Sequence, residues 1–486
     1  MNGRALLRQW PEPACSSHGL ALWDSLEIEA ATGGKASRAF QCSGIETDSR
    51  DVREGDLFVA LRGEVTDGHR FIDAAFANGA VAAITDRPVA FPHVLVRDTT
   101  AALQALADAA RERAGAVRIG VTGSVGKTGV KEAIFTALDR ASRGAAHRSV
   151  KSYNNHVGVP LSLARMPSRS RFGVFEMGMN HAGELDALTR HVRPHVAIVT
   201  TIAPAHIEYL GSMEAIADAK AEIFSGLVEG GTAVIPADLP ESQRLIEHAR
   251  AAQARIVTFG RDENATVRLL DAIPAANGGS LVTVDLGERR LCYSVAEPGE
   301  HWIVNSLCVM AAVHAAGGDL AAAGLALAEM GGLKGRGARH DLHLPGGGKA
   351  LLIDESYNAN PASMRATLRQ LGQTPATRRI AVLGSMKELG DFADRFHAQL
   401  AGTLAEAGID HAILVGEEMQ VLARDLGKAG NHPLGNPASF AHCRDPQEAI
   451  AALEEFGIKA GDAILVKGSN SVGLGRLVAH FTGLDH

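Results

Sequence analysis

A short glycine-rich stretch has the residue types and spacing of a phosphate-binding loop. In such a loop, backbone N–H groups turn toward one anion, and the N-terminus of the following helix adds partial positive charge. The lysine reaches the β- and γ-phosphates of a nucleotide, and the next hydroxyl ligates Mg²⁺. We therefore predict a nucleoside triphosphate site formed by Gly123, Ser124, Val125, Gly126, Lys127 and Thr128.

The elements around this loop support the prediction. Residues 117–121 are an apolar run that predicts a buried strand, and Val130, Ile134 and Leu138 recur at helical spacing after the loop. The usual loop has a glycine where this chain has Val121, so the motif here is GxxGKT rather than GxxxxGKT. A plain glycine turn between a strand and a helix is the alternative interpretation.

Two further side chains follow predicted strands, at the edge where open α/β sheets bind ligands. Glu176 comes directly after a strand-like apolar pair, and His206 follows the apolar run 196–199. A carboxylate near the Thr128 hydroxyl would complete an oxygen-rich Mg²⁺ site. A histidine in the position of His206, taken alone, is more often a packed or surface residue.

Asn154, Asn155 and Lys220 are the other polar residues of interest in this part of the chain. The paired asparagines offer hydrogen-bond donors and acceptors to a ligand of mixed polarity. Lys220 lies in a segment with helical spacing, and composition alone would make it a solvated lysine. Because an ammonium group cannot ligate Mg²⁺, a metal role for Lys220 requires its conversion to an anion.

The first hundred residues carry a separate pattern. Asp48, Ser49 and Arg50 are adjacent on a predicted loop, where they could hold a polar, anionic ligand or form a solvated turn. A strand-like run bracketed by glycines follows them. We predict a small α/β domain for residues 1–98, and a helix after it that is capped by Thr99 or Thr100.

The composition excludes several classes of protein. With 486 residues, 46% of them hydrophobic and 21% charged, the chain is typical of a globular protein of about three domains. The formal charge of −7 argues against a nucleic-acid binder. Five scattered cysteines without CxxC spacing fit a reducing cytoplasm. No segment approaches about 18 uninterrupted apolar residues, so we expect no membrane insertion.

Strands and helices alternate through most of the remaining sequence, which predicts an α/β protein with parallel sheets. We place a central ATP-binding domain at residues 99–337, with an antiparallel annex after Asn264. A doubly wound, Rossmann-like C-terminal domain is expected at residues 338–486. The glycine-rich segment 331–337 marks the boundary between these two domains.

Several motifs occur together in the order found in the Mur ligase family, which builds the peptide of bacterial cell-wall precursors. They are the GxxGKT loop, Asn154-Asn155-His156-Val157-Gly158-Val159-Pro160, Glu176-Met177-Gly178-Met179-Asn180-His181, Ala205-His206-Ile207-Glu208 and Ala219-Lys220-Ala221-Glu222-Ile223-Phe224. The resemblance covers nearly the whole chain. It implies a UDP-binding N-terminal domain, a central ATPase domain and a Rossmann-like C-terminal domain.

The resemblance also implies roles for individual residues. Two Mg²⁺ ions would be held by Thr128, Glu176, His206 and a carbamate formed from Lys220 and CO₂, with Lys127 acting on the transferred phosphoryl group. The ATP side would further include Asn305, Arg336 and Asp354, and Arg339 is the alternative to Arg336. The UDP-precursor side would include Asp48, Ser49, Arg50, Asn154 and Asn155. Trp302 stands where the family has an asparagine.

The C-terminal motifs resemble those of the family members that add D-alanyl-D-alanine to UDP-N-acetylmuramoyl-tripeptide. They are Asp354-Glu355-Ser356-Tyr357-Asn358-Ala359-Asn360-Pro361, Met386-Lys387-Glu388-Leu389-Gly390 with His397, and Leu465-Val466-Lys467-Gly468-Ser469. The resemblance implies ATP-dependent amide formation through an acyl phosphate, in the cytoplasm, by a protein that we expect to be a monomer. Tyr357, Asn358 and Asn360 are the expected dipeptide contacts.

Other interpretations fit the sequence less well. The family member that adds the third amino acid carries an Asp-Asn-Pro-Arg signature, which is absent here, and folylpolyglutamate synthase lacks the UDP-binding first domain. A P-loop GTPase would need an Asn-Lys-x-Asp motif, which does not occur. A non-enzymatic sensor of UDP-peptides would not need Lys127, Glu176, His206 and Lys220 together.

Overall fold

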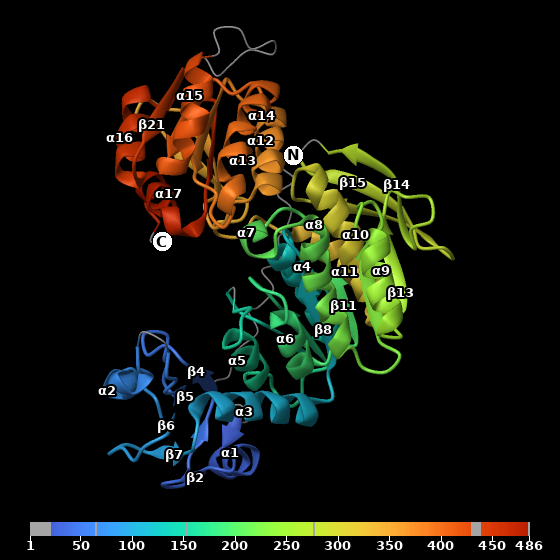
Figure 1. Ribbon diagram of the computed structural model, residues 1–486, viewed down its shortest axis with the longest axis vertical. Helices are drawn as coiled ribbons and strands as arrows, with labels where there is room; N and C mark the ends of the chain where they lie inside the picture. Colours follow the sequence, from blue (N-terminus) through green and yellow to red (C-terminus); the bar gives the residue numbers. More distant parts are fainter. Residues whose placement is uncertain (1–20, 64–65, 152, 276–277, 429–438, 485–486) are drawn as a thin grey trace, which may run out of the picture. The chain divides into compact units, whose positions relative to one another are not determined.

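The computed structural model describes residues 21–63, 66–151, 153–275, 278–428 and 439–484. Its contacts divide the chain into two compact units, residues 1–113 with 163–168 and residues 114–162 with 169–486. Each unit is built from mostly parallel sheets with helices on them (Figure 1), which confirms the predicted α/β class. No helix in the described part of the chain is long and apolar enough to cross a bilayer.

The first unit is built on a five-stranded sheet in which four neighbouring strands are parallel. In spatial order the strands are β2 (Lys35–Ala36), β7 (His93–Leu95), β6 (Ala82–Thr85), β5 (Asp56–Val59) and β4 (Gly44–Glu46), with β2 antiparallel to β7. A separate antiparallel pair is β1 (Trp23–Asp24) and β3 (Gln41–Cys42). The helices are α1 (Ser25–Thr32), the 3₁₀ turn η1 (Gly68–Phe71), α2 (Ile72–Ala77) and α3 (Thr99–Ala114). Every residue of β5 and β6 is buried, as expected of central parallel strands.

The helix predicted to start at Thr99 or Thr100 is α3, but its cap is a different residue. The carboxylate of Asp98 accepts from the backbone N–H groups of Thr100 (2.7 Å) and Ala101 (3.0 Å). The prediction of a threonine cap was therefore wrong, because α3 already includes Thr99 and Thr100, and the capping position before the helix is Asp98. Contacts group α3 as far as Arg113 with the first unit, whereas the predicted domain boundary precedes the helix.

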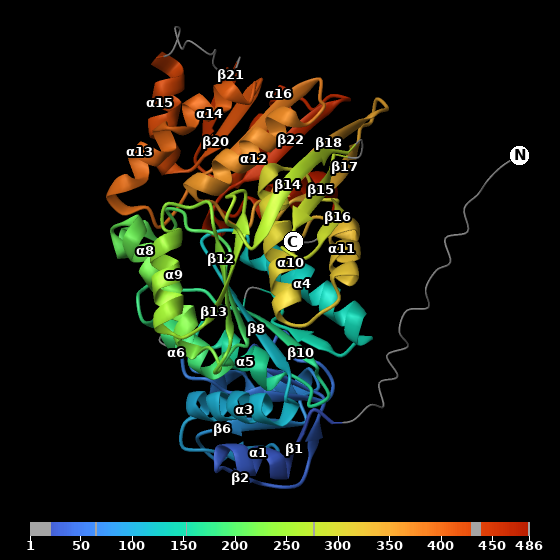
Figure 2. The ribbon, with the colours of Figure 1, turned by 90° about the vertical axis from the view of Figure 1, so that its right-hand side faces the viewer.

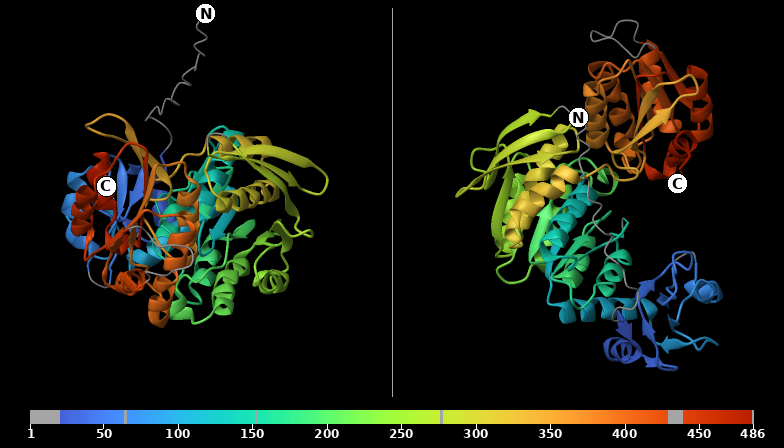
Figure 3. Two further views of the ribbon diagram at one scale, coloured as in Figure 1. Left: turned by 90° about the horizontal axis from the view of Figure 1, so that it is seen from above. Right: turned by 180° about the vertical axis from the view of Figure 1, so that it is seen from behind.

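The first sheet of the second unit has nine strands, and the strand of the glycine loop lies in its parallel part. In spatial order the strands are β16 (Arg290–Val295), β15 (Ser280–Asp285), β14 (Val267–Pro274), β13 (Arg255–Gly260), β12 (Thr232–Pro236), β11 (Val196–Val199), β8 (Val117–Thr122), β10 (Phe172–Glu176) and β9 (Ala146–Arg148). The pairs β14–β15 and β15–β16 are antiparallel, which confirms the predicted annex; Figure 3 shows it extending outward from the parallel strands.

Helices on this sheet position the loop. They are α4 (Lys127–Ser142), α5 (Gly158–Ala164), α6 (Glu184–Val192), α7 (Ile207–Leu210), α8 (Met213–Ala221), the 3₁₀ turn η2 (Glu222–Gly226), α9 (Ser242–Ala251), α10 (Glu300–Ala315) and α11 (Leu320–Glu329). The apolar face of α4 packs with β8 and α10 in one core that contains Val130, Ile134 and Leu138. Val121 is also fully buried in this core. Val121, which stands where the usual loop has a glycine, is therefore part of the buried strand β8, and the loop begins only at Gly123.

The C-terminal sheet of the second unit has six strands. In spatial order they are β17 (Ala338–His343), β18 (Lys349–Glu355), β22 (Asp462–Lys467), β19 (Arg378–Gly384), β20 (His411–Val415) and β21 (Ser439–Cys443), parallel except for the β17–β18 pair. The helices are α12 (Pro361–Gln373), α13 (Ala393–Ala398), α14 (Leu400–Glu406), α15 (Gln420–Lys428), α16 (Pro446–Phe456) and α17 (Gly475–Thr482), with 3₁₀ turns η3 (Gly390–Phe392), η4 (Glu417–Met419) and η5 (Asn470–Val472). Helix α12 lies against this sheet (Figure 2). The alternation predicted from the sequence is therefore present.

Candidate active site

One cavity of about 610 Å³ in the second unit gathers most of the predicted residues. Its walls come from the loops after β8, β9, β10, β11 and β12, from the start of α10, from the segment before β17, from the end of β22 and from the chain that follows β18. The predicted residues in its lining are Ser124, Val125, Gly126, Lys127, Asn154, Glu176, His206, Asn305, Arg336, Tyr357, Asn358 and Asn360. Residues far apart in the sequence thus face the same space.

The glycine loop is held firmly at the start of α4. The backbone N–H of Ser124 donates to the carbonyl of Thr201 (2.9 Å), and its hydroxyl donates to the carbonyl of Ala203 (3.0 Å). Gly126 precedes the helix with a φ of 88°, which favours glycine. The first-turn N–H groups of a helix have no partner within the helix, so this loop is suited to an anion.

Gly123 is the glycine of the loop that tolerates no side chain. Its φ is 144°, and a Cβ added there would lie 1.9 Å from the hydroxyl oxygen of Thr200. That hydroxyl donates to the carbonyl of Val125 at 2.5 Å, so it cannot move away without loosening the loop. We expect Gly123→Ala to weaken the binding of a non-hydrolysable ATP analogue by about tenfold or more, as measured by calorimetry.

Gly402→Ala is the matched control for this change. Gly402 lies in α14, and a Cβ added there would meet open space. Analogue affinity should therefore stay at the wild-type value, with stability unchanged or raised by about 0.5–1 kcal/mol. Wild-type affinity in Gly123→Ala would contradict the proposed fit between the loop and a phosphate.

Lys127 is folded back over its own loop. Its Nζ donates to the carbonyl of Gly123 at 2.6 Å, and the side chain lines the cavity. Burial lowers the pKa of Lys127, and the nearby cation of Arg336 lowers it further, while Glu176 acts in the opposite direction. A phosphate bound in the loop would give the Lys127 ammonium group a negatively charged partner.

Thr128 and Glu176 meet as predicted. The Thr128 hydroxyl donates to Oε2 of Glu176 at 2.8 Å, although the two residues lie on different elements. The Glu176 carboxylate is only 1% exposed, and its other oxygen, Oε1, accepts from the amide of Asn154 at 2.9 Å. A carboxylate and a hydroxyl so placed form an oxygen donor set that fits Mg²⁺.

The paired asparagines have separate local contacts. Asn154 holds Glu176, as described, and it lines the cavity. Asn155 faces the next helix, where its Oδ1 accepts from the N–H groups of Val157 (3.2 Å) and Gly158 (2.9 Å). Both side chains therefore have positioning roles within the second unit, and their expected contacts with the UDP precursor stay a prediction.

His206 and Lys220 lie near this site in different environments. His206 lines the cavity at the start of α7, and its Nδ1 lies 2.6 Å from Oε2 of Glu388. Lys220 is 1% exposed on α8, and within the described part of the chain its Nζ donates no side-chain hydrogen bond. Burial lowers the pKa of Lys220 well below its ordinary value, and the cation of Lys127 adds to the effect. The interpretation of Lys220 as a solvated lysine is therefore wrong.

These residues do not form a ready-made metal cluster. In the described ranges, no group of three or more His, Cys, Asp and Glu side chains is arranged to hold a metal ion. Ligands beyond Glu176 and His206 would have to come from Thr128, from the nucleotide and from a modified Lys220.

The far side of the cavity is formed by α10, by the segment before β17 and by the chain after β18. The amide of Asn305 lies against Gly126, where an added Cβ would be 3.0 Å from its Oδ1. The Arg336 guanidinium stacks over the Tyr357 ring at 4.2 Å. Asn360 lines the cavity but caps α12, because its Oδ1 accepts from the N–H of Ser363 at 2.9 Å.

Two predicted contacts with the nucleotide have other surroundings. Asp354 is fully buried outside the cavity lining, and its carboxylate accepts from the backbone N–H groups of Gly335 (2.8 Å) and Ser356 (3.1 Å). It thereby fixes the connection between the sheets instead of reaching into the cavity. Arg339 interacts with the carboxylate of Glu297, whose pKa burial raises to about 7. Of the two candidate arginines, Arg336 is the one that lines the cavity.

The structure adds two residues to which the sequence analysis gave no role. Glu355 and Lys467 are paired in register at the ends of β18 and β22, and both line the cavity. The Lys467 ammonium, 2% exposed, donates to the carbonyl of Asn358 (2.8 Å) and to the carboxylate of Glu355 (3.3 Å). Their position at strand ends in two recognised motifs was the signal available in the sequence.

Trp302 also lines the cavity, where its ring rests on α4. A Cβ added to Gly129 would lie 2.8 Å from the Trp302 ring, so the missing side chain of Gly129 provides the space for the indole. Trp302 and Asn305 lie one turn apart on α10. Trp302 packs against Gly129 and Asn305 against Gly126, two glycines that are three residues apart at the start of α4.

In the first unit, Asp48 and Arg50 pair with each other. The carboxylate of Asp48 accepts from Nε (2.9 Å) and Nη2 (2.6 Å) of Arg50, whose side chain is 87% exposed. Ser49 is buried, and its carbonyl accepts from the amide of Asn78 at 2.8 Å. The expected contacts of these three residues with UDP stay a prediction.

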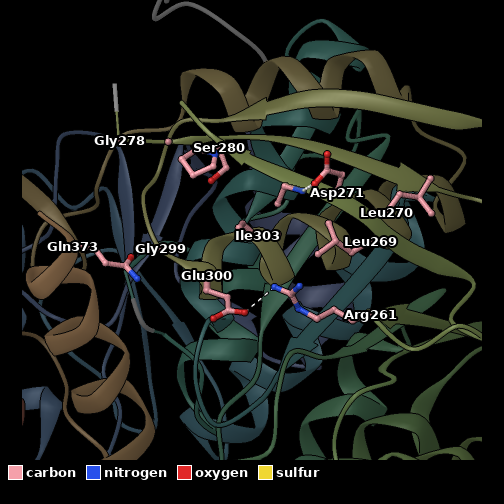
Figure 4. A pocket seen from close by; sticks show the side chains of 13 residues that line it. Arg261, Leu269, Leu270, Asp271, Gly278, Ser280, Gly299, Glu300, Ile303 and Gln373 are labelled. Atoms are coloured by element: carbon pink, nitrogen blue, oxygen red, sulfur yellow. Dashed lines mark hydrogen bonds and ion pairs between the residues drawn. The ribbon is translucent and has the colours of Figure 1, made fainter. Parts of the chain in front are cut away.

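A second cavity, of about 450 Å³, lies between the annex and α10. Figure 4 shows Arg261 and Glu300 joined across it by an ion pair of 2.7 Å. Its lining contains none of the predicted site residues, so it does not contribute to the chemistry argued above.

Models of known protein families match most of the chain. The Mur ligase family catalytic domain matches residues 41–121, the Mur ligase middle domain matches residues 121–313, and the Mur ligase glutamate ligase domain matches residues 344–470.

Whole proteins match over similar lengths. UDP-N-acetylmuramoyl-tripeptide–D-alanyl-D-alanine ligase of Synechocystis is 36% identical over 91% of this chain and 92% of that protein. The ligase of the same name from Escherichia coli is 33% identical over 89% and 92%. Among solved structures, MurF from Acinetobacter baumannii has a TM-score of 0.80 at 29% identity, covering 95% of this chain and 99% of that one. MurF from Thermotoga maritima in complex with ADP has a TM-score of 0.72 at 26% identity, covering 90% and 97%.

Proposed function

The chain belongs to the Mur ligase family, and we propose that it is an ATP-dependent ligase that joins D-alanyl-D-alanine to UDP-N-acetylmuramoyl-tripeptide in peptidoglycan precursor synthesis. The observation that carries the proposal is one cavity lined by the phosphate loop, by Glu176 and by Tyr357 and Asn358. Relatives that match most of the chain are named for this reaction.

The chemistry explains why ATP is required. A carboxylate does not react with an amine at neutral pH, because its carbon is a poor electrophile and oxide is a poor leaving group. Transfer of the γ-phosphoryl group to the tripeptide carboxylate gives an acyl phosphate. The amine of D-alanyl-D-alanine then attacks the acyl carbon, and the tetrahedral intermediate collapses to the amide and phosphate.

The loop residues act on the phosphoryl group. Residues 123–128 hold the phosphates through backbone N–H groups, and Lys127 moves from the Gly123 carbonyl to the transferring group. Charge that develops on this group then meets the Lys127 cation, and electrostatic stabilisation of this kind is the main way a protein accelerates phosphoryl transfer. Asn305 and Arg336 orient the nucleotide from the opposite wall.

The oxygen donors described above fit Mg²⁺. Thr128 and Glu176 would hold one ion, and His206 with a modified Lys220 would hold a second. When bound, the ions neutralise the negative charge of the two anions that must approach each other.

The buried amine of Lys220 suits conversion to a carbamate. Burial lowers the pKa of Lys220 well below its ordinary value and so favours the neutral amine. The lone pair of that amine can attack the carbon of CO₂, with loss of one proton. The product is an anion with two oxygen donors, and the nearby Lys127 cation stabilises it. Falling pH should remove the modification, since protonation competes with CO₂ for the same lone pair.

Residues of the C-terminal sheet serve the incoming amine. Tyr357 and Asn358, which line the cavity, would contact the dipeptide. Glu355, held by Lys467, offers a carboxylate that can bind its ammonium group and accept a proton before attack. Asp354 supports this wall from behind by fixing Gly335.

The UDP-linked substrate would bind through the first domain. Asp48, Ser49 and Arg50 would hold the UDP moiety, which makes residues 1–98 the precursor-binding domain, 99–337 the ATPase domain and 338–486 the C-terminal domain. A precursor that carries UDP is a cytoplasmic metabolite, so the enzyme would act in the cytoplasm, as a monomer.

Phosphate release from ATP tests the proposed reaction. We expect release to require both UDP-N-acetylmuramoyl-tripeptide and D-alanyl-D-alanine, because no Asp-Asn-Pro-Arg signature for a diamino acid is present. D-alanine alone should give little turnover. Equal turnover with meso-diaminopimelate on the UDP-linked dipeptide would assign the chain to the preceding step instead.

A further inference from the structure

The loop that follows β19 places a carboxylate against the imidazole of His206. Oε2 of Glu388 lies 2.6 Å from Nδ1 of His206, and this nitrogen is buried from solvent without a hydrogen bond of good geometry. His206 also lines the nucleotide cavity. With Nδ1 occupied by Glu388, Nε2 is the nitrogen that the ring can offer to a ligand in that cavity.

Both residues have unusual backbone conformations. His206 (φ 59°) and Glu388 (φ 63°) are among the few described residues other than glycine with positive φ. Arg143, Arg193 and Gln253 share the feature, but they lie at or just after the C-terminal ends of helices, where it is common. Lys151 (φ 53°) is a further example, in the turn after β9. His206 instead precedes a helix, and Glu388 lies in a loop. Strain held in place at such positions often marks a functional contact.

The loop that carries Glu388 is firmly anchored. The backbone N–H of Met386 donates to Nε2 of the buried His397 (2.9 Å), and the N–H of Lys387 donates to the hydroxyl of Ser469 (3.0 Å). Two residues further on, a Cβ added to Gly390 would lie 2.9 Å from the side chain of Glu208. The loop therefore packs directly on α7, the helix that begins after His206.

We propose that Glu388 is a positioning residue that orients His206 as a metal ligand and makes this orientation depend on the packing of the loop after β19 and of η3 against α7. The inference rests on the proposed function, in which His206 holds a Mg²⁺ ion. A carboxylate on one ring nitrogen fixes the tautomer and the ring direction, and it makes the other nitrogen a better donor to a metal.

Glu388→Asn is the sharpest test, because asparagine tolerates positive φ but is too short to reach His206. The change therefore removes the contact without adding backbone strain. We expect it to weaken Mn²⁺ binding by about tenfold in the presence of a non-hydrolysable ATP analogue, measured from the free Mn²⁺ signal by electron paramagnetic resonance. Glu388→Gln keeps the length and should have a smaller effect.

The matched control is Glu418→Gln. Glu418 pairs with Lys387, the neighbour of Glu388, and thus carries the same charge near the same loop without contacting His206. Mn²⁺ affinity in this variant should stay within about twofold of wild type, as for most surface substitutions.

Nitrogen NMR of histidine-labelled protein gives a second readout that needs no metal. The resonances of His206 among the 20 histidines are assigned by their loss in His206→Gln. We expect the tautomer protonated on Nδ1 in wild type and in Glu418→Gln, and a shift toward the tautomer protonated on Nε2 in Glu388→Asn.

These experiments distinguish a failure of the metal role proposed for His206 from a failure of the positioning role of Glu388. If His206→Gln binds Mn²⁺ as wild type does, the metal assignment of the proposed function fails and the inference fails with it. If His206→Gln loses affinity while Glu388→Asn keeps both the affinity and the tautomer of wild type, only the inference is overturned.

Discussion

Lys220→Ala is expected to lower ligation by roughly a hundredfold or more, the size of effect seen when one strong electrostatic stabiliser is removed. The substitution deletes the nitrogen on which a carbamate would form, and with it the anionic oxygens needed beside His206. An exposed lysine would give a different result, because surface substitutions usually change stability by within about 0.5 kcal/mol. The assay is ATP hydrolysis coupled to ligation.

Chemical rescue distinguishes a lost ligand from a damaged fold. Acetate or formate at high concentration could occupy the space left in Lys220→Ala and partly restore turnover. Lys220→Arg should not be rescued, because the guanidinium fills the space and stays positive. Activity close to wild type in untreated Lys220→Ala would rule out the carbamate.

Lys127→Ala is expected to reduce kcat by about a hundredfold or more, because charge that develops on the γ-phosphoryl group would lose its cation. In the absence of nucleotide, Lys127 contacts a backbone carbonyl, so its removal should leave the fold intact. The measurement is steady-state ligation together with the thermal midpoint of unfolding.

Lys349→Ala serves as the control for this variant. Lys349 is more than half exposed and pairs with Asp341 on the β17–β18 hairpin. Lys349→Ala therefore removes one positive charge, as Lys127→Ala does, but at a site outside the cavity. Its kcat should match wild type. Activity of Lys127→Ala within about threefold of wild type would mean that the loop does not stabilise the transferring phosphate in the manner of such electrostatic sites.

The sequence was most informative about polar residues that come directly after a predicted strand. Thr128 and Glu176 were expected to meet because parallel neighbours end at one edge of a sheet, and their side chains lie 2.8 Å apart. The short loop was recognised despite Val121, since the strand before it and the helix after it have clear periodicity.

Contacts between side chains of the C-terminal sheet were harder to predict, because they depend on the pairing of strands that are distant in the sequence. Nothing local indicates that Glu355 lies beside Lys467, because their contact arises from the pairing of β18 with β22. Neighbouring strand residues point to opposite faces, so Asp354 and Glu355 cannot both face the cavity. The motif alone favoured Asp354, whereas the structure has Glu355 in the lining.

Side chains that cap helices were a second difficulty. Asp98 caps α3 in place of the neighbouring threonines. Asn360 lines the cavity and also caps α12 through its Oδ1, and its expected contact with the dipeptide stays a prediction. A short polar side chain can satisfy the backbone or a ligand, and sequence spacing does not show which it does. Burial of Lys220 was equally hard to predict, because it depends on the packing of α8 against α7, α9 and η2.

Transfer of ¹⁸O from the acid to phosphate is the most direct test of the central claim. UDP-N-acetylmuramoyl-tripeptide labelled in its terminal carboxylate would be ligated to D-alanyl-D-alanine with ATP, and the phosphate and the peptide product would be analysed by mass spectrometry. Attack of that carboxylate on the γ-phosphorus predicts one ¹⁸O in each phosphate released and ADP as the other product. Unlabelled phosphate, or label recovered in AMP, would contradict an acyl phosphate and with it the proposed role of this cavity.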